Sequence, residues 1–190
     1  MNKKTRSIRD KHSRGELAKD ILKGLALGGL IVSSFALPNL PQIFHLFGVG
    51  SSKERFKVKR SISKLQKKKL VIIYEKDGMD VVEITKEGEK KISKYKLEEM
   101  KILRPKKWDG KWRIIIFDIP EKFKKARNAL SKKISNMEIY PLQKSVFVCP
   151  FSCRDEIDFI GEFFNVRKYI YYIEADKVEK DKTLRDFYNI

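Results

Sequence analysis

Cysteine and histidine are scarce in this sequence, which limits the metal and nucleophile chemistry it can support. Its 190 residues include two cysteines, Cys149 and Cys153, and two histidines, His12 and His45. Two thiols so close together beside a proline are a poor basis for the disulfide framework of a secreted domain. They also lack the further ligands of a closed zinc site. We therefore expect a reducing cytoplasm, no structural metal and no cofactor.

Catalytic motifs and negative charge are also in short supply. The sequence contains no glycine-rich phosphate loop and no recognisable Ser-His-Asp arrangement. Against 43 lysines and arginines it has 25 aspartates and glutamates, for a net charge of +18. Such a balance indicates a polyanionic partner, either nucleic acid or an anionic membrane surface. Hydrophobic residues make up 42% of the chain, which is enough for packed cores. The length leaves room for one large or two small domains, and we favour two compact units.

A membrane-spanning run is the third feature that the sequence lacks. Residues 24–37 carry no charge for fourteen positions before Pro38, fewer than the roughly 20 apolar residues that cross a bilayer. The apolar spacing over 16–37 predicts a helix that packs into a core. A membrane span, or an export signal cleaved near 34–36, is the alternative for this stretch. We expect no membrane partner.

The N-terminal part of the chain is organised around a basic helix. Residues 1–15 read as a flexible basic arm, and a short apolar helix over 42–47 follows the helix at 16–37. A third helix is predicted over 53–69, capped by Ser51 or Ser52. Its apolar stripe is Val58, Ile62 and Leu65, with the aliphatic stem of Lys69 as a possible extension.

The rest of this third helix is almost entirely cationic. It carries nine lysines and arginines and a single acidic residue, Glu54. Like charges at helical spacing repel one another, and phosphate contact would relieve that repulsion. A solvated charged face is the alternative interpretation. The candidate DNA-binding residues are Lys53, Arg55, Lys57, Arg60, Ser61, Lys64, Lys67 and Lys68, with Lys76 from the segment that follows.

That following segment has the pattern of a hairpin. Strands are predicted over 70–74 and 80–85, joined across Asp77-Gly78, and a helix over 86–100 closes the unit. Two helices, a basic helix and a hairpin form the order of a winged helix-turn-helix, whose last helix enters the major groove of duplex DNA. We assign 16–101 to such a domain. A ribbon that merely covers the core is the alternative for the hairpin.

The C-terminal part predicts an α+β fold of a different kind. After a linker at 102–107, the domain at 108–190 reads as strand 112–117, helix 121–135, strands 138–140 and 143–149, helix 153–164 and strand 167–174. This βαββαβ order is ferredoxin-like, with both helices on one face of the sheet. The last strand would display Tyr169, Tyr171 and Ile173 on the other face, which favours a homodimer interface. The tail over 178–190 is either a strand or a helix.

Two family resemblances meet in this domain. The run Phe117-Asp118-Ile119-Pro120, the basic helix after it, and Gln143-x-Ser145-Val146-Phe147 resemble the CRISPR-associated protein 2 family of ferredoxin-like nucleases. The resemblance implies that Asp118 holds Mg²⁺ for an endoribonuclease or endodeoxyribonuclease. The position of Asp118 before a helix also fits a simple helix cap, and we favour the cap.

The preceding Trp108-Asp109-Gly110-Lys111-Trp112-Arg113 resembles instead the central domain of PaaX-type transcriptional repressors. These repressors share the nuclease-like fold but carry it behind a DNA-binding winged helix. The resemblance implies a transcriptional repressor that binds duplex DNA as a homodimer. It also implies a possible small-molecule effector and a further C-terminal domain beyond this stretch. Two hypotheses therefore stand: a DNA-binding regulator, which we favour, and a Mg²⁺-dependent nuclease.

Overall fold

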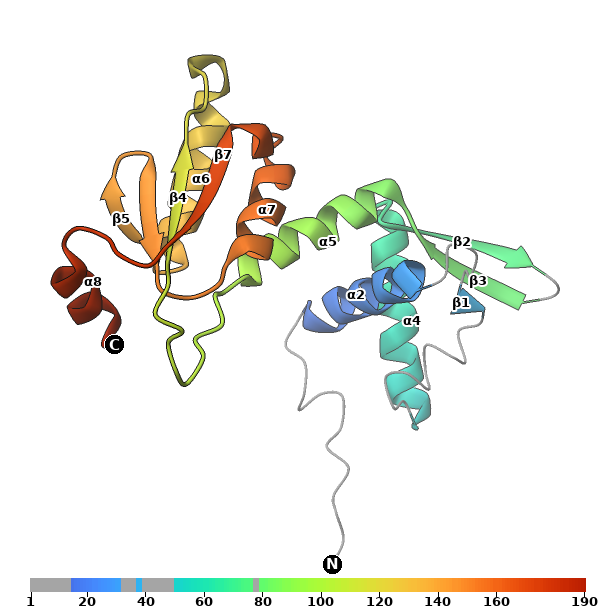
Figure 1. Cartoon of the computed structure of the whole chain (residues 1–190). Helices are drawn as coiled ribbons and strands as arrows, with labels where there is room; N and C mark the ends of the chain where they lie inside the picture. The colour runs from blue at the N-terminus through green and yellow to red at the C-terminus, as the bar shows by residue number, and fades with distance from the viewer. Residues whose placement is uncertain (1–14, 32–36, 39–49, 77–78) are drawn as a thin grey trace, which may run out of the picture. The chain divides into compact units, whose positions relative to one another are not determined.

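The structure, a computed structural model, describes residues 15–31, 37–38, 50–76 and 79–190 (Figure 1). The predicted helix at 42–47, the Asp77-Gly78 turn and nearly all of the basic arm lie outside these residues. The chain divides into two compact units, Met1–Lys96 and Leu97–Ile190. The division falls inside a helix, and Ile102, which the sequence assigns to a linker, packs against the core of the second unit.

The first unit joins helices to a small sheet. Helix α2 (Glu16–Ile31) contributes Leu17, Ile21, Leu22 and Leu25 to its core, and α4 spans Ser52–Lys67. Strands β2 (Val71–Lys76) and β3 (Met79–Ile84) pair antiparallel over their whole length, as the hairpin pattern predicts. Helix α5 (Lys86–Glu99) follows.

A third strand in this unit was not predicted. Strand β1 (Leu37–Pro38) pairs with Val82 and Val81 of β3 and gives the sheet order β1-β3-β2. The helix predicted over 16–37 is therefore wrong at its last residue, which is extended. Pro38 has no N–H to donate to a second neighbour, so it is suited to the edge position it occupies. Among the described residues, no helix has both the length and the apolar character needed to cross a bilayer.

The second unit confirms the predicted βαββαβ order. Strand β4 (Trp112–Phe117) is followed by the 3₁₀ turn η1 (Glu121–Phe123) and α6 (Lys124–Asn136), then β5 (Tyr140–Gln143) and β6 (Val146–Cys149). Helix α7 (Arg154–Phe163), the 3₁₀ turn η2 (Arg167–Tyr169) and β7 (Ile170–Ala175) complete it. The strands lie in the order β5-β6-β4-β7, and all the pairs are antiparallel. The last strand thus begins three residues later than the predicted 167.

The sheet of the second unit has two differently covered faces. Ile115, Phe147 and Ile170 point to one face and are buried in the core with Leu130 of α6 and Ile160 of α7. Strand alternation places Trp112, Val148 and Ile173 on the other face. The helices therefore cover one face, as expected for this fold.

The undecided tail is a helix, and it covers part of the second face. Helix α8 (Asp181–Tyr188) accepts a hydrogen bond from Trp112 Nε1 at Asp181 Oδ1, 3.0 Å away. The Tyr188 hydroxyl donates to the Val148 carbonyl oxygen at 2.8 Å and accepts from the Tyr140 N–H at 2.8 Å. Farther along this face, Tyr171 and Ile173 of β7 are 62% and 43% exposed.

The start of α5 is fixed against the end of α4 by Thr85 and Gly88. The Thr85 hydroxyl donates to the Lys69 carbonyl oxygen at 2.7 Å and accepts from the Gly88 N–H at 3.1 Å. A Cβ atom at position 88 would lie 2.2 Å from the Leu70 carbonyl oxygen and 2.6 Å from Ile84 Cγ1. Only glycine allows the helix to approach the hairpin this closely.

We therefore expect Gly88→Ala to destabilise the first unit by about 1–3 kcal/mol, because the added methyl group meets a backbone oxygen that cannot move aside. Alanine's better helix propensity, worth about 0.5–1 kcal/mol, offsets only part of this cost. Urea unfolding followed by circular dichroism measures the difference. Gly50→Ala is the matched control, since a Cβ there meets no atom within 4 Å. Equal stability of the two variants would contradict the prediction.

Candidate nucleic-acid interface

The N-terminus of α4 is fixed by a capping box. The Ser51 hydroxyl accepts a hydrogen bond from the Glu54 N–H at 3.3 Å, and Glu54 Oε2 accepts from the N–H groups of Ser51 and Gly50, each at 3.2 Å. Of the two serines that the sequence offers as caps, Ser51 is the one used. The reciprocal bonds satisfy donors that a bare helix end would leave without partners. The one acidic residue of α4 is thereby held at the end of the helix.

The inner face of α4 is the predicted apolar stripe. Val58, Ile62 and Leu65 are buried, and they pack in one core with the apolar residues of α2 and with Val71 and Val82 of the hairpin. Lys69 does not extend this stripe, because it is exposed and has φ 57° where the chain leaves the helix. The three buried residues set the rotation of α4 about its axis.

The outer face of α4 carries the candidate DNA-binding residues. The exposed ones are Lys53, Arg55, Arg60, Lys64, Lys67 and Lys68, whereas Lys57 and Ser61 are half-buried beside the apolar stripe. Within the described part of the chain, no carboxylate forms an ion pair with any lysine or arginine of α4. The structure therefore brings most of the predicted residues together on one helix surface and leaves their charges to solvent or a partner.

Strand β2, which follows α4 in the sequence, carries further exposed residues. Lys76, the remaining candidate, is exposed at the end of β2. On the outer side of the same strand, Ile72 and Tyr74 are also exposed. A hydrogen bond to Glu83 on β3 raises the pKa of Tyr74 above its ordinary value. The tip between the strands lies outside the described residues.

One exposed residue of α4 was missed by the sequence analysis. Phe56 is 67% exposed, the largest value among the aromatic residues of the described chain. Phe56 belongs neither to the charged residues nor to the apolar stripe on which the prediction for α4 rests. The available signal was its position two residues before Val58, which places it across the helix from the buried stripe.

In the second unit, Asp118 lies exposed just after β4, as predicted, but it does not cap a helix. Its N–H donates to the Tyr169 carbonyl oxygen at 3.1 Å. Pro120 occupies the N-cap position of η1, and no side chain caps that turn. The acidic residue that serves the helix start is Glu121, which pairs with Lys124 at 3.0 Å and with Arg127 at 2.9 Å. These two cations lower the pKa of Glu121.

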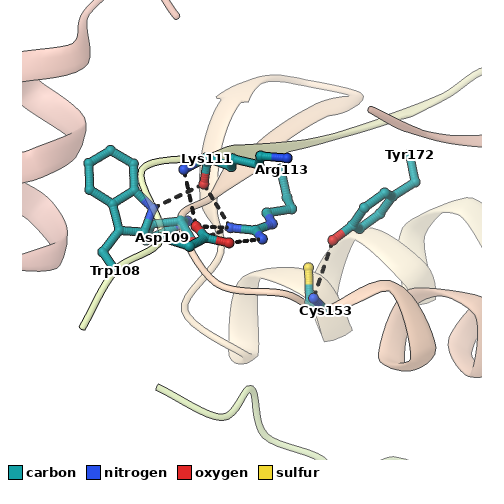
Figure 2. Close-up of polar contacts among 7 residues, drawn as sticks. Trp108, Asp109, Lys111, Arg113, Cys153 and Tyr172 are labelled. Carbon is teal, nitrogen blue, oxygen red and sulfur yellow. Dashed lines mark hydrogen bonds and ion pairs between the residues drawn. The ribbon is translucent and has the colours of Figure 1, made fainter. Parts of the chain in front are cut away.

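Across the described ranges, no group of three or more His, Cys, Asp or Glu side chains is arranged to hold a metal ion. Cys149 and Cys153 are both buried as free thiols. The hydrogen bond between them lowers the pKa of Cys149 and raises that of Cys153. The Cys153 N–H donates to the Tyr172 hydroxyl at 3.3 Å (Figure 2), and burial raises the pKa of Tyr172 to about 12.

The turn from Trp108 to Arg113 is built around a buried arginine (Figure 2). Arg113 NH1 donates to Asp109 Oδ1 at 2.7 Å and to the carbonyl oxygens of Lys111 and Pro150, each at 2.8 Å. Asp109 Oδ1 also accepts from the Lys111 N–H at 3.1 Å, and Trp108 Nε1 donates to the Lys111 carbonyl oxygen at 3.0 Å. The motif is thus a structural clasp that joins the start of β4 to the end of β6.

The three residues proposed for a dimer interface do not share one surface. Tyr171 and Ile173 lie on β7 directly opposite Ile116 and Ile114 of β4, so these four side chains form a strip on the second face of the sheet. Tyr169 belongs to η2 instead and is half-buried, with its ring centroid 5.9 Å from that of Phe123. The alternation predicted from Tyr169 onward fails because the strand has not yet begun there.

This geometry defines a class of domain. Its members have a ferredoxin-like sheet, a buried arginine clasp and an aspartate after the first strand. Residues 105–186 match the family model of the PaaX protein central Cas2-like domain. The second unit is therefore a domain of this type, as the Trp108–Arg113 motif indicated. No curated protein matches the chain.

The clasp leads to a prediction about pH. The Arg113 guanidinium lowers the pKa of Asp109 to about 2 from its ordinary value near 4. A lowered pKa means that the carboxylate stabilises the fold fully above pH about 4, and that this contribution is lost as the pH falls toward 2. We expect Asp109→Asn to destabilise the second unit by about 1 kcal/mol at neutral pH. This value is at the lower end of the range for a buried donor that loses its acceptor. The lower end applies because Asp109 is half exposed, so solvent screens its charge.

Thermal unfolding followed by tryptophan fluorescence measures this effect, because both tryptophans, Trp108 and Trp112, belong to the second unit. The stability difference between parent and variant should narrow from pH 4 to pH 2. Asp118→Asn is the control, since within the described residues its carboxylate makes no hydrogen bond or ion pair. If the stability difference between the parent and Asp109→Asn does not change with pH, the charge of Asp109 does not contribute to stability.

Proposed function

We propose that this protein is a PaaX-type transcriptional regulator that binds duplex DNA through its first unit and dimerises through its second. The observation that carries the proposal is the outer face of α4, a set of cations that the described carboxylates leave unpaired. The match of the second unit to the PaaX central domain supports it independently. The protein would act in the cytoplasm, as a repressor, and the second unit could also receive a small-molecule effector.

The proposed recognition helix is α4, within a winged helix-turn-helix. The order of α2, α4, β2 and β3 is compatible with that fold, in which the helix before the hairpin enters the major groove and the hairpin tip touches the backbone. The long side chains of Arg60, Lys64 and Lys67 would reach phosphates. Each phosphate contact releases condensed counterions, so affinity from this source falls steeply with salt.

We expect the triple variant Arg60→Ala, Lys64→Ala, Lys67→Ala to bind duplex DNA more weakly and with a shallower dependence on salt. Each lost phosphate contact should reduce the slope of log affinity against log salt by about 0.9. The matched control is Lys122→Ala, Lys125→Ala, Lys132→Ala, which removes the same charge from exposed positions around α6. Equal slopes for the two triple variants would mean that total charge, and not the face of α4, determines binding.

Selection of bound sequences from a random duplex pool tests the regulatory function itself. A two-fold dimer would present two copies of α4 to DNA, so enrichment of an inverted repeat with half-sites about one helical turn or a multiple apart is the expected result. Binding without any enriched sequence would contradict a role in operator recognition.

The dimer proposal depends on the strip of Ile114, Ile116, Tyr171 and Ile173, in which the two residues of β7 are exposed and the two of β4 are half-buried. An apolar strip on an otherwise charged protein is favourable only when it is buried, and a second copy of the same strip would be self-complementary about a two-fold axis. We expect Tyr171→Glu, Ile173→Glu to convert a dimer into a monomer in sedimentation at micromolar concentration. Leu103→Glu is the control, because Leu103 is 84% exposed and lies outside the strip. A monomeric parent would remove the dimer from the proposal.

A Mg²⁺-dependent endonuclease is the second candidate, and the position of Asp118 favours it. Asp118 is exposed at the carboxyl end of β4 in a Cas2-like domain, and a two-fold axis through the strip of β4 and β7 residues could bring two such carboxylates to one Mg²⁺. Assay of DNA and RNA cleavage with Mg²⁺ separates the candidates. Cleavage that Asp118→Asn abolishes, without loss of duplex binding, would favour the nuclease.

A further inference from the structure

Phe56 is an apolar side chain in the middle of a cationic surface. It is 67% exposed, although the same helix buries three other apolar residues. Lys53 and Arg60 lie one helical turn before and after it on the same side of α4, and Lys59 lies beside it. Within the described part of the first unit, Phe56 is not among the residues that form the core or pack against it, so the described packing does not explain a phenylalanine here.

The surroundings of Phe56 define what kind of partner fits it. Glu54, the one carboxylate of α4, is turned toward the capping box at the helix end. A partner must therefore supply negative charge for the flanking cations and an apolar group for the ring between them. The major groove of duplex DNA offers both, since phosphates line its edges and the 5-methyl group of thymine projects from its floor.

The position of Phe56 along α4 agrees with this partner. It is the fifth residue of a helix that begins at Ser52. In helix-turn-helix proteins, residues in the N-terminal part of the recognition helix contact base edges, while longer basic side chains reach the backbone on either side. The bases of a duplex remain stacked, so the methyl group is the apolar surface that the ring can reach without opening the helix.

We propose that Phe56 is a specificity-determining residue that packs against the 5-methyl group of a thymine in the major groove. This inference rests on the proposed function. Replacement of thymine by uracil removes that methyl group and leaves base pairing and backbone charge unchanged. The contact can therefore be tested one methyl group at a time.

The experiment uses the full chain and the duplex sequence that selection enriches. Each thymine of the half-site is replaced in turn by deoxyuridine, and affinities are measured for the parent and for Phe56→Ala. At one position we expect the parent to lose about fourfold in affinity, the factor for burying one methyl-sized group. Phe56→Ala should bind the thymine and uracil duplexes equally well, and its salt slope should equal that of the parent because no phosphate contact is removed.

Two further variants define the outcome. Phe56→Leu keeps apolar surface and should retain a reduced preference for thymine, whereas Leu103→Ala, which removes an exposed apolar side chain outside α4, should keep the full preference. The inference is overturned if Phe56→Ala discriminates thymine from uracil as the parent does, or if it loses affinity equally for both duplexes. If the parent binds no duplex or enriches no sequence, the proposed function fails first and the thymine contact fails with it.

Discussion

The burial of Val58, Ile62 and Leu65 is the contact on which the cationic surface of α4 depends. Burying such a side chain stabilises a fold by roughly 1.5–3 kcal/mol, whereas a like-charge pair one turn apart in a helix costs about 0.2–0.5 kcal/mol. Three buried residues therefore outweigh the repulsion among the cations, and the helix forms without carboxylates between them. The same burial fixes which residues point outward. The capping box adds a fixed starting point, so the outer face has a defined direction and a defined register.

A comparable role in the second unit belongs to Arg113. A buried guanidinium is costly unless hydrogen bonds compensate it. Here NH1 donates to Asp109, Lys111 and Pro150 and NH2 donates to Asp109, while Nε has no partner among the described residues. These acceptors lie at the start of β4 and just after β6. The arginine thus couples two strands that are neighbours in the sheet but distant in sequence.

The features that could be predicted from the sequence are those with a local signal. The spacing of Val58, Ile62 and Leu65 defined α4, and the alternating elements of the second unit defined its βαββαβ order.

Strand β1 was missed because two residues have no period, and its partner β3 lies far along the chain. The prediction that Asp118 caps a helix was wrong because Pro120 occupies the N-cap position. Tyr169 was assigned to the strand because a 3₁₀ turn in front of a strand has no distinct pattern. Helix α8 is too short for its period to exclude a strand. Phe56 was missed although its position across the helix from the buried stripe could have been read from the sequence.

The separation between the two faces of α4 has a consequence for evolution. The residues that hold the helix in place are hidden from any partner, and those that could meet a partner contribute little to holding it in place. Substitution on the outer face should therefore have only small effects on stability, typically within about 0.5 kcal/mol. Under the proposed function, a duplicated copy of such a gene could acquire a new target sequence through a few exposed positions, without first acquiring a compensating change in its core.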